Sequence, residues 1–251
     1  MRILYFANNR LGWEILRWLK TTGQDIAGLV LHPPGKRKWG AEIREAAGLA
    51  DELIFDGSRL GDPAVMDSIR ELAPEVGLSV LFGYILRPPL LNLFPAGVLN
   101  LHPSYLPFNR GAAPNVWSIV EGTPAGATLH RIDAGVDTGE ILAQQIVPVD
   151  PTDTGASLYR KLETASMTLF QRAWPEFLAG RLLPMAQPAT GGTCHRMNDF
   201  ERIDEIDLDR QYRARDLINV LRARSFPPHQ GAYFRIAAKK VHMRLELEYG
   251  D

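Results

Sequence analysis

The first hundred residues alternate between short apolar runs and segments whose apolar positions recur at helical spacing. Residues 2–7 form an apolar run that predicts a strand, and Leu11, Ile15, Leu16 and Leu19 then recur at the spacing of one helix face. Further runs predict strands at residues 26–31, 53–55, 76–82 and 98–101, with helices at 40–49 and 63–72 between them. Strands joined by helices form parallel sheets. The pattern therefore predicts an α/β fold with a Rossmann-like, doubly wound and mostly parallel sheet.

The pattern changes after residue 127. Residues 128–132 and 141–149 predict two strands joined by the turn-rich segment 133–139. Apolar positions from Leu158 to Ala173 then predict a long amphipathic helix that ends near Gly180.

The segment 184–194 carries prolines and glycines without periodicity, which is typical of a linker. We therefore expect a main domain over residues 1–185 and a small C-terminal segment over residues 195–251. That segment contains a helix pattern at 213–224 and two strand patterns, at 232–237 and 240–248, that predict a β-hairpin.

Charge argues against a nucleic-acid or membrane partner. The 251 residues carry 28 Lys and Arg against 29 Asp and Glu, and residues 195–251 carry 11 against 10, a net charge of +1. The first apolar run reaches Asn8 too soon to be a signal peptide or a membrane span. We expect a cytoplasmic protein.

The number of cysteines and the spacing of possible metal ligands also exclude disulfides and some classes of metal site. Cys194 is the only cysteine, so disulfides within the chain and thiolate-rich zinc sites are excluded. No cluster of His, Asp and Glu has the spacing of a metal site, and we expect no metal.

Ligands of doubly wound sheets bind at the carboxyl ends of the strands, so the residues there are the first candidates. The first strand is followed by Asn8, Asn9, Arg10, Leu11 and Gly12, which is neither a dinucleotide fingerprint nor a P-loop. Asn9 and Arg10 at the start of a helix are suited to one anionic group, or they are solvated turn residues.

Asn100 and His102 give the strongest local signal. Two residues apart in a strand, they point to the same face at its carboxyl end. An amide that donates to an oxyanion beside an imidazole that accepts a proton suits attack on a carbonyl, although a single histidine is more often structural. His32, His130, His195, His229 and His242 have no comparable neighbours, and we expect structural roles for them.

Asp133 and Asp137, in the turn at 133–139, are candidates to orient His102, or they cap the turn. No serine or cysteine stands in a nucleophile elbow. The residues by themselves suggest acyl transfer without a covalent enzyme intermediate.

Three motifs in the same order resemble the folate-dependent formyltransferases, which move a formyl group from 10-formyltetrahydrofolate to an amine. They are residues 100–104 (Asn-Leu-His-Pro-Ser), 110–114 (Arg-Gly-Ala-Ala-Pro) and 130–139 (His-Arg-Ile-Asp-Ala-Gly-Val-Asp-Thr-Gly). The similarity covers roughly residues 1–180. It implies a formyltransferase fold in which Asn100, His102 and Asp137 form the catalytic triad.

The resemblance also implies binding residues. Gly83, Tyr84, Ile85 and Leu86 would line the pterin pocket together with Asp133 and Val136. In such enzymes the amine attacks the formyl carbon, Asn100 donates to the oxyanion, His102 acts as base or oxyanion partner, and Asp137 holds His102. Whether His102 or Asp137 first accepts the proton stays open.

Residues 8–12, 107–111, 114–118 and 221–228 look like the sugar N-formyltransferases, whose acceptors are nucleotide-linked amino-dideoxysugars of lipopolysaccharide O-antigens. This implies Asn9, Arg10, Tyr105 and Arg110 as substrate contacts and a homodimer as the assembly. Arg87 and the cluster Lys36–Lys38 are weaker options for the diphosphate, and the cluster also fits a solvated loop. Trp117 fits either a stacking residue or a core residue.

Two alternatives remain. The motif at 110–114 also resembles the methionyl-tRNA formyltransferases, which carry a larger, basic C-terminal domain. The other alternative is a non-catalytic folate-binding or nucleotide-sugar-binding protein, against which the intact Asn100, His102 and Asp137 count. The pattern leaves open which nucleotide the sugar carries and whether the amine is on its third or fourth carbon.

Overall fold

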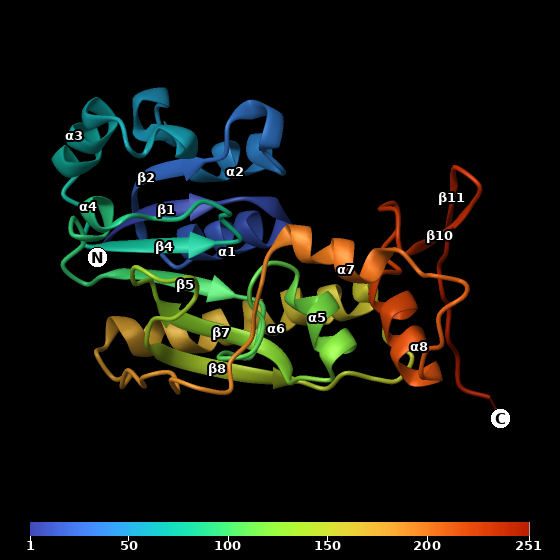
Figure 1. Cartoon of the computed structure of the whole chain (residues 1–251). Helices are drawn as coiled ribbons and strands as arrows, with labels where there is room; N and C mark the ends of the chain where they lie inside the picture. The colour runs from blue at the N-terminus through green and yellow to red at the C-terminus, as the bar shows by residue number, and fades with distance from the viewer. Residues whose placement is uncertain (251) are drawn as a thin grey trace. The chain divides into compact units, whose positions relative to one another are not determined.

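The computed structural model describes residues 1–250, which contain a seven-stranded sheet with helices along it (Figure 1). The strand order is β3-β2-β1-β4-β5-β7-β8. The strands are β1 (Arg2–Ala7), β2 (Asp25–Leu31), β3 (Ile54–Asp56), β4 (Val76–Val80), β5 (Val98–His102), β7 (Ala125–Arg131) and β8 (Ile141–Val147). The pairs from β3 to β5 are parallel, and β7 runs antiparallel to β5. The prediction of a doubly wound, mostly parallel sheet is confirmed.

The helices largely follow the predicted periodicity. They are α1 (Asn9–Thr21), α2 (Gly40–Ala47), α3 (Pro63–Glu71), α4 (Pro88–Leu91), α5 (Pro114–Glu121), α6 (Gly155–Leu178), α7 (Glu201–Asp204) and α8 (Ala214–Ala223). Short 3-10 turns cover Pro34–Lys36, Asp51–Leu53, Gly57–Arg59 and Met197–Phe200. No helix within residues 1–250 has the length and apolar character needed to cross a membrane.

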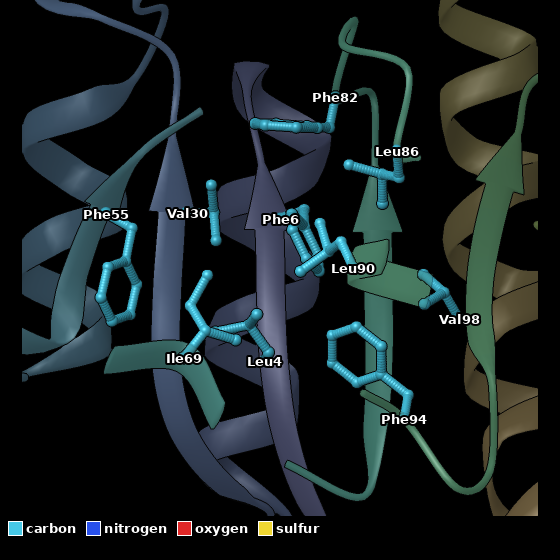
Figure 2. Packing of buried hydrophobic residues seen from close by; sticks show 10 residues of the cluster. All are labelled: Leu4, Phe6, Val30, Phe55, Ile69, Phe82, Leu86, Leu90, Phe94 and Val98. Carbon is cyan, nitrogen blue, oxygen red and sulfur yellow. The ribbon is translucent and has the colours of Figure 1, made fainter. Parts of the chain in front are cut away.

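Alternating side chains of the strands bury both faces of the sheet. On one face, Leu4 and Phe6 of β1 and Val30 of β2 pack with residues of α3 and α4 in a cluster that also contains Phe55, Ile69, Phe82, Leu86, Leu90, Phe94 and Val98 (Figure 2). Tyr5 points to the other face, where its hydroxyl donates to the carbonyl oxygen of Gly12 in α1 at 2.7 Å. Alternate side chains of β1 thus pack against helices on opposite faces of the sheet.

The chain divides into two compact units. The first comprises residues 1–102, 128–143 and 167–187, and the second comprises residues 103–127, 144–166 and 188–250. The division into 1–185 and 195–251 stays a prediction.

In the second unit, the end of the predicted linker is fixed by hydrogen bonds. Strand β9 (Cys194–His195) pairs in parallel with β6 (Arg110–Gly111), and the Arg110 N–H donates to the Thr193 carbonyl oxygen at 2.9 Å. Trp117, 5% exposed, stacks on His195 with ring centroids 4.1 Å apart. Trp117 is therefore a core residue, as one of its two interpretations expected.

The predicted C-terminal hairpin is present but shorter. Strand β10 (Tyr233–Ile236) pairs antiparallel with β11 (Lys239–His242). The prediction of a strand up to Glu248 is wrong, because the chain leaves the hairpin after Met243. The Met243 N–H still donates to the carbonyl oxygen of Ala232 opposite it, whereas the Leu245 N–H donates to the Ser225 hydroxyl, each at 2.8 Å.

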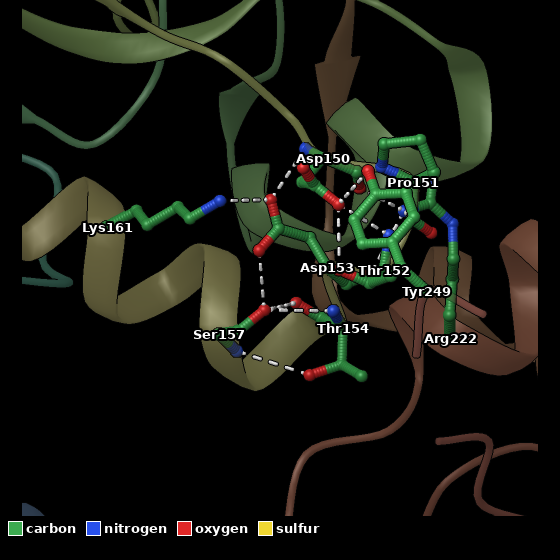
Figure 3. A network of polar contacts seen from close by, with 9 residues as sticks. All are labelled: Asp150, Pro151, Thr152, Asp153, Thr154, Ser157, Lys161, Arg222 and Tyr249. Carbon is green, nitrogen blue, oxygen red and sulfur yellow. Dashed lines mark hydrogen bonds and ion pairs between the residues drawn. The ribbon is translucent and has the colours of Figure 1, made fainter. Parts of the chain in front are cut away.

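Helix α8 is attached to the turn before α6 by a buried arginine (Figure 3). Arg222 Nη1 lies 3.0, 3.2 and 2.9 Å from the carbonyl oxygens of Asp150, Pro151 and Asp153. The Asp153 carboxylate, itself buried, accepts from the Lys161 ammonium at 2.6 Å. One side chain of α8 thereby satisfies three carbonyl groups of this turn.

Candidate active site

The carboxyl end of β5 carries Asn100 and His102, as predicted. They are two residues apart on a strand and so share a face. His102 is 6% exposed and Asn100 is half-buried. Strand β5 lies between β4 and β7 in the interior of the sheet.

Asp137 reaches the same place from the turn after β7. Its Oδ2 lies 3.6 Å from His102 Nε2, and its Oδ1 accepts from Asn100 Nδ2 at 3.3 Å. The structure thus brings together the three residues that the motifs implied.

The turn that presents Asp137 has an unusual backbone. Asp137 has a φ of 51°, in the left-handed region that few non-glycine residues adopt. Gln187 holds the turn, since its side-chain amide donates to the carbonyl oxygens of Asp137 and Gly139 at 2.8 Å each. A Cβ on Gly139 would lie 1.9 Å from the Arg131 carbonyl oxygen, which explains the glycine.

The sequence pattern showed no comparable neighbours for His130, and the structure corrects this, because His130 lies beside Asn100 and Asp137. Across the antiparallel pair, Asn100 lies directly opposite His130, and opposite residues share a face. The Asn100 Nδ2 lies 3.1 Å from His130 Nε2, and His130 Nε2 lies 3.5 Å from Asp137 Oδ1. The missed signal was the register: His130 is in phase with Asn100 only if β7 pairs antiparallel with β5.

The tautomer of His130 follows from its other contact. Its Nδ1 lies 2.8 Å from the Arg131 carbonyl oxygen, which only accepts, so Nδ1 carries the proton of the neutral ring. Nε2 is then an acceptor, and it takes one N–H of the Asn100 amide. In this arrangement the second N–H points to Asp137.

Asp133 behaves differently from Asp137. It is exposed, and its Oδ1 accepts from the Gly135 N–H at 2.9 Å and from the Thr138 hydroxyl at 2.6 Å. Its side chain therefore caps the turn, which was one of its two interpretations. Val136, next to Asp137, is 44% exposed. The roles of Asp133 and Val136 in cofactor binding stay predictions.

The loop at 83–86 follows β4 at the same edge of the sheet. Ile85 is 71% exposed and Tyr84 is half-buried, whereas Leu86 is 3% exposed and belongs to the core cluster. The Gly83 N–H donates to His32 Nε2 at 3.2 Å, and the His32 ring lies edge-on to Tyr84. Burial lowers the pKa of His32, with Lys36 acting in the same direction and Asp56 opposing it.

Asn9 and Arg10 lie at the start of α1, as expected. Arg10 is exposed, and its guanidinium lies 3.5 Å from the Glu14 carboxylate, one helical turn on. Tyr105 and Arg110 lie in the second unit and are half-buried. As substrate contacts, these four residues stay predictions.

The chemistry available to the first unit is that of an attack on a carbonyl. An amide donor, an imidazole and a carboxylate gather around one point, and the amide nitrogen of Asn100 and the carboxylate of Asp137 have defined partners. Within residues 1–250, no group of three His, Cys, Asp or Glu side chains is arranged to hold a metal ion.

Comparison with known proteins shows the family. Residues 1–174 match the Formyl transferase family, and residues 199–249 match the family described as the N-formyltransferase dimerization C-terminal domain. The chain belongs to the formyl transferase family. The prediction of a formyltransferase is confirmed.

Individual relatives carry different names. A methionyl-tRNA formyltransferase of Chloroflexus aurantiacus is 33% identical over 230 residues, which cover 86% of this chain and 74% of that protein. A 4-N formyltransferase from Francisella tularensis superposes with a TM-score of 0.82 and 25% identity, over 99% of this chain and 98% of that one.

A third relative was solved with ligands. The formyltransferase PseJ from Anoxybacillus kamchatkensis, in complex with UDP-4,6-dideoxy-4-formamido-L-AltNAc and tetrahydrofolate, is 28% identical. The match has a TM-score of 0.58 and covers 80% of this chain and 89% of that one.

Proposed function

We propose that this chain transfers the formyl group of 10-formyltetrahydrofolate to the amino group of a nucleotide-linked amino-dideoxysugar. The observation that carries the proposal is the similarity to PseJ, whose solved complex holds UDP-4,6-dideoxy-4-formamido-L-AltNAc. The similarity to the Francisella 4-N formyltransferase extends over 98% of that chain. The methionyl-tRNA formyltransferase shares its sequence similarity over 74% of its own length.

The donor site of this proposal lies at the edge where β4, β5 and β7 meet. The loop at 83–86 and the turn at 133–137 flank Asn100 and His102 in the strand order, and they present the exposed side chains of Ile85 and Val136. Exposed apolar side chains beside backbone polar groups suit a flat heterocycle such as a pterin. The tetrahydrofolate in the PseJ complex supports this donor.

The reaction needs one carbon–nitrogen bond to form and one to break. The amine nitrogen attacks the formyl carbon, the carbonyl oxygen becomes an oxyanion, and the bond from that carbon to N10 of the folate then breaks. The nitrogen loses a proton and N10 gains one. His102 Nε2 and Asp137 Oδ2, 3.6 Å apart, are the groups of this site that are placed to take up and return the proton.

Asn100 is the donor to the oxyanion. One of its N–H groups is held by His130 at 3.1 Å, and the other is directed at Asp137 at 3.3 Å. The formyl oxygen therefore takes over the N–H that Asp137 holds in the free protein. This exchange releases Asp137 toward His102 in the step in which the proton moves.

The second candidate acceptor is initiator methionyl-tRNA. The observation that favours it is the sequence identity of 33% to methionyl-tRNA formyltransferases. Against it stands the balance of charge in residues 195–251, 11 basic against 10 acidic residues, since tRNA phosphates are held by excess positive charge.

An acceptor panel tests the proposal. Purified protein is incubated with 10-formyltetrahydrofolate and nucleotide-linked 3-amino or 4-amino dideoxysugars, with initiator methionyl-tRNA in parallel and the His102→Ala variant as control. We expect formylation of one sugar by the wild type and a loss of about 10²- to 10⁴-fold in the variant. Formylation of tRNA alone would show that the acceptor is methionyl-tRNA and not a sugar. Folate binding without any transfer would favour the non-catalytic alternative.

We further propose a cytoplasmic homodimer that serves lipopolysaccharide O-antigen synthesis. The dimer rests on the description of the family that residues 199–249 match, and on two exposed apolar side chains of the hairpin, Ile236 and Val241. The biosynthetic role rests on the resemblance to sugar N-formyltransferases.

A further inference from the structure

A tryptophan is displayed on a basic surface loop of the first unit. Trp39 is 41% exposed, although tryptophan usually buries most of its ring. Its φ is 58°, a backbone conformation that is uncommon for a bulky residue. The exposure of its side chain distinguishes Trp39 from Trp117 and Trp174, which are 5% and 1% exposed.

The ring is supported from one side. Trp39 packs on Trp13 of α1 with ring centroids 5.3 Å apart and an interplanar angle of 31°. The Arg17 guanidinium carbon lies 4.8 Å from the Trp13 ring centroid. Because Trp13 is fixed in α1, the exposed part of Trp39 is a preorganised aromatic surface that loses little freedom when a ligand stacks on it.

The loop is also attached to the turn after β1. The Lys38 N–H donates to the Asn8 side-chain oxygen at 2.8 Å, and the Asn9 N–H donates to the Lys38 carbonyl oxygen at 3.1 Å. Asn8 is 6% exposed. These bonds hold Trp39 at the carboxyl ends of β1 and β2, the same edge that carries Asn100 and His102 at the end of β5.

Basic residues precede Trp39 in the same loop. Lys36 and Lys38 are exposed, and Arg37 turns its guanidinium to the His32 carbonyl oxygen at 2.7 Å. Arg10 belongs to the adjoining turn and has Glu14 as a partner. An exposed aromatic ring in a loop with exposed lysines complements a base linked to a diphosphate.

We propose that Trp39 stacks on the base of the nucleoside diphosphate that carries the sugar, with Lys36 and Lys38 facing its phosphates. This proposal rests on the proposed function, and it specifies where the base of the nucleotide binds. In the strand order β2-β1-β4-β5, three spacings of about 4.8 Å put Trp39 about 14 Å from the catalytic strand. An extended nucleotide sugar spans such a distance, with its amine at His102 and its diphosphate over the end of β1.

The test compares variants of Trp39. Trp39→Leu keeps an apolar contact with Trp13 and removes the aromatic face, whereas Trp39→Tyr keeps an aromatic face. Leu183→Ala, at an 85% exposed apolar position outside this loop, is the matched control. Calorimetry gives the Kd of UDP, dTDP and GDP, and kinetics give KM for the sugar acceptor and for the folate. Thermal unfolding checks that each variant is folded.

We expect Trp39→Leu to weaken binding of the nucleotide that the wild type prefers by roughly tenfold or more. Trp39→Tyr and Leu183→Ala should bind as the wild type does within about threefold, and KM for the folate should not change. Lys36→Ala with Lys38→Ala should weaken nucleotide binding and reduce its dependence on salt.

Three outcomes would overturn the inference. If a folded Trp39→Leu variant binds the nucleotide as tightly as the wild type does, the base does not stack on Trp39, and the proposed function still stands. Failure of the wild type both to bind a nucleotide and to formylate a nucleotide sugar removes the proposed function as well. Impaired formylation of tRNA in Trp39→Leu, with nucleotide binding unchanged, assigns the loop to tRNA.

Discussion

At the scale of single residues, the orientation of one amide carries the proposed chemistry. Asn100 and His130 face each other across β5 and β7, and the neutral His130 ring accepts from Asn100 Nδ2 at 3.1 Å. Without this contact the amide could turn its carbonyl oxygen toward the site, and an oxyanion would meet an acceptor. His130 is therefore a positioning residue in our account.

A double-mutant cycle tests that role. His130→Ala should lower kcat for formyl transfer by about tenfold or more, since it leaves the amide of Asn100 unoriented. In an Asn100→Ala background the same change should have almost no further effect, because there is no amide left to orient. His130→Gln, whose side-chain oxygen accepts, should recover part of the rate. Equal losses from His130→Ala in both backgrounds would mean a structural role only.

His32 predicts a dependence on pH. The Gly83 N–H needs the bare Nε2 of neutral His32, and burial holds the pKa of His32 below its usual value of about 6.5. The unfolded chain therefore takes up this proton first as pH falls. Stability from this contact is complete above about pH 6.5 and is lost as the pH falls through 6.5 toward the lowered pKa.

The measurement is urea unfolding and the Kd of 5-formyltetrahydrofolate at several pH values. In the wild type, the free energy of unfolding and the affinity for 5-formyltetrahydrofolate should both fall below about pH 6.5. His32→Gln, whose side-chain oxygen accepts without titrating, should depend less on pH. An unchanged pH response in His32→Gln would assign the effect to another group.

At the scale of elements, the attachment of α8 depends on Arg222. Its guanidinium donates to three carbonyl oxygens of the turn at 150–153 (Figure 3). The side-chain oxygen of Asn219 accepts from Arg222 Nε at 2.9 Å. Buried carbonyl groups that lose their donor pay the cost of desolvation. The contact of α8 with the turn before α6 is thus made by a polar side chain of an otherwise amphipathic helix.

Arg222→Met should lower the free energy of unfolding by about 2–3 kcal/mol, since it fills similar space and removes the charged donor. Arg215→Met, at an exposed position of the same helix, is the control and should change stability little. Chemical denaturation of both variants measures the difference. Equal stability of the two would show that the carbonyl groups find other donors.

At the scale of the whole molecule, the sequence predicted the architecture better than the detail of the site. Periodicity found the strands from β1 to β5 because parallel strands are buried on both faces and read as apolar runs. It missed His130, whose role depends on the register between two strands. It extended the second hairpin strand to Glu248, although the Leu245 N–H bonds outside the ladder, to the Ser225 hydroxyl. Register and long-range hydrogen bonds are not local properties of a sequence.

The exposed apolar side chains of the hairpin give a prediction about assembly. Ile236→Asp with Val241→Asp should convert a homodimer to a monomer, because the charges would be buried without partners at the interface. Light scattering after size exclusion measures the mass. Leu183→Asp, outside residues 199–249, is the control. A dimer that survives both hairpin substitutions would place the interface elsewhere.

The choice of acceptor is the central claim, and one competition experiment tests it most directly. Limiting 10-formyltetrahydrofolate is offered to the wild-type protein with equal concentrations of the nucleotide-linked amino sugar that the panel identifies and initiator methionyl-tRNA. Mass spectrometry of both products gives the partition of the formyl group. Our account predicts that the formyl group goes to the sugar amine, and formyl-methionyl-tRNA as the main product would contradict it.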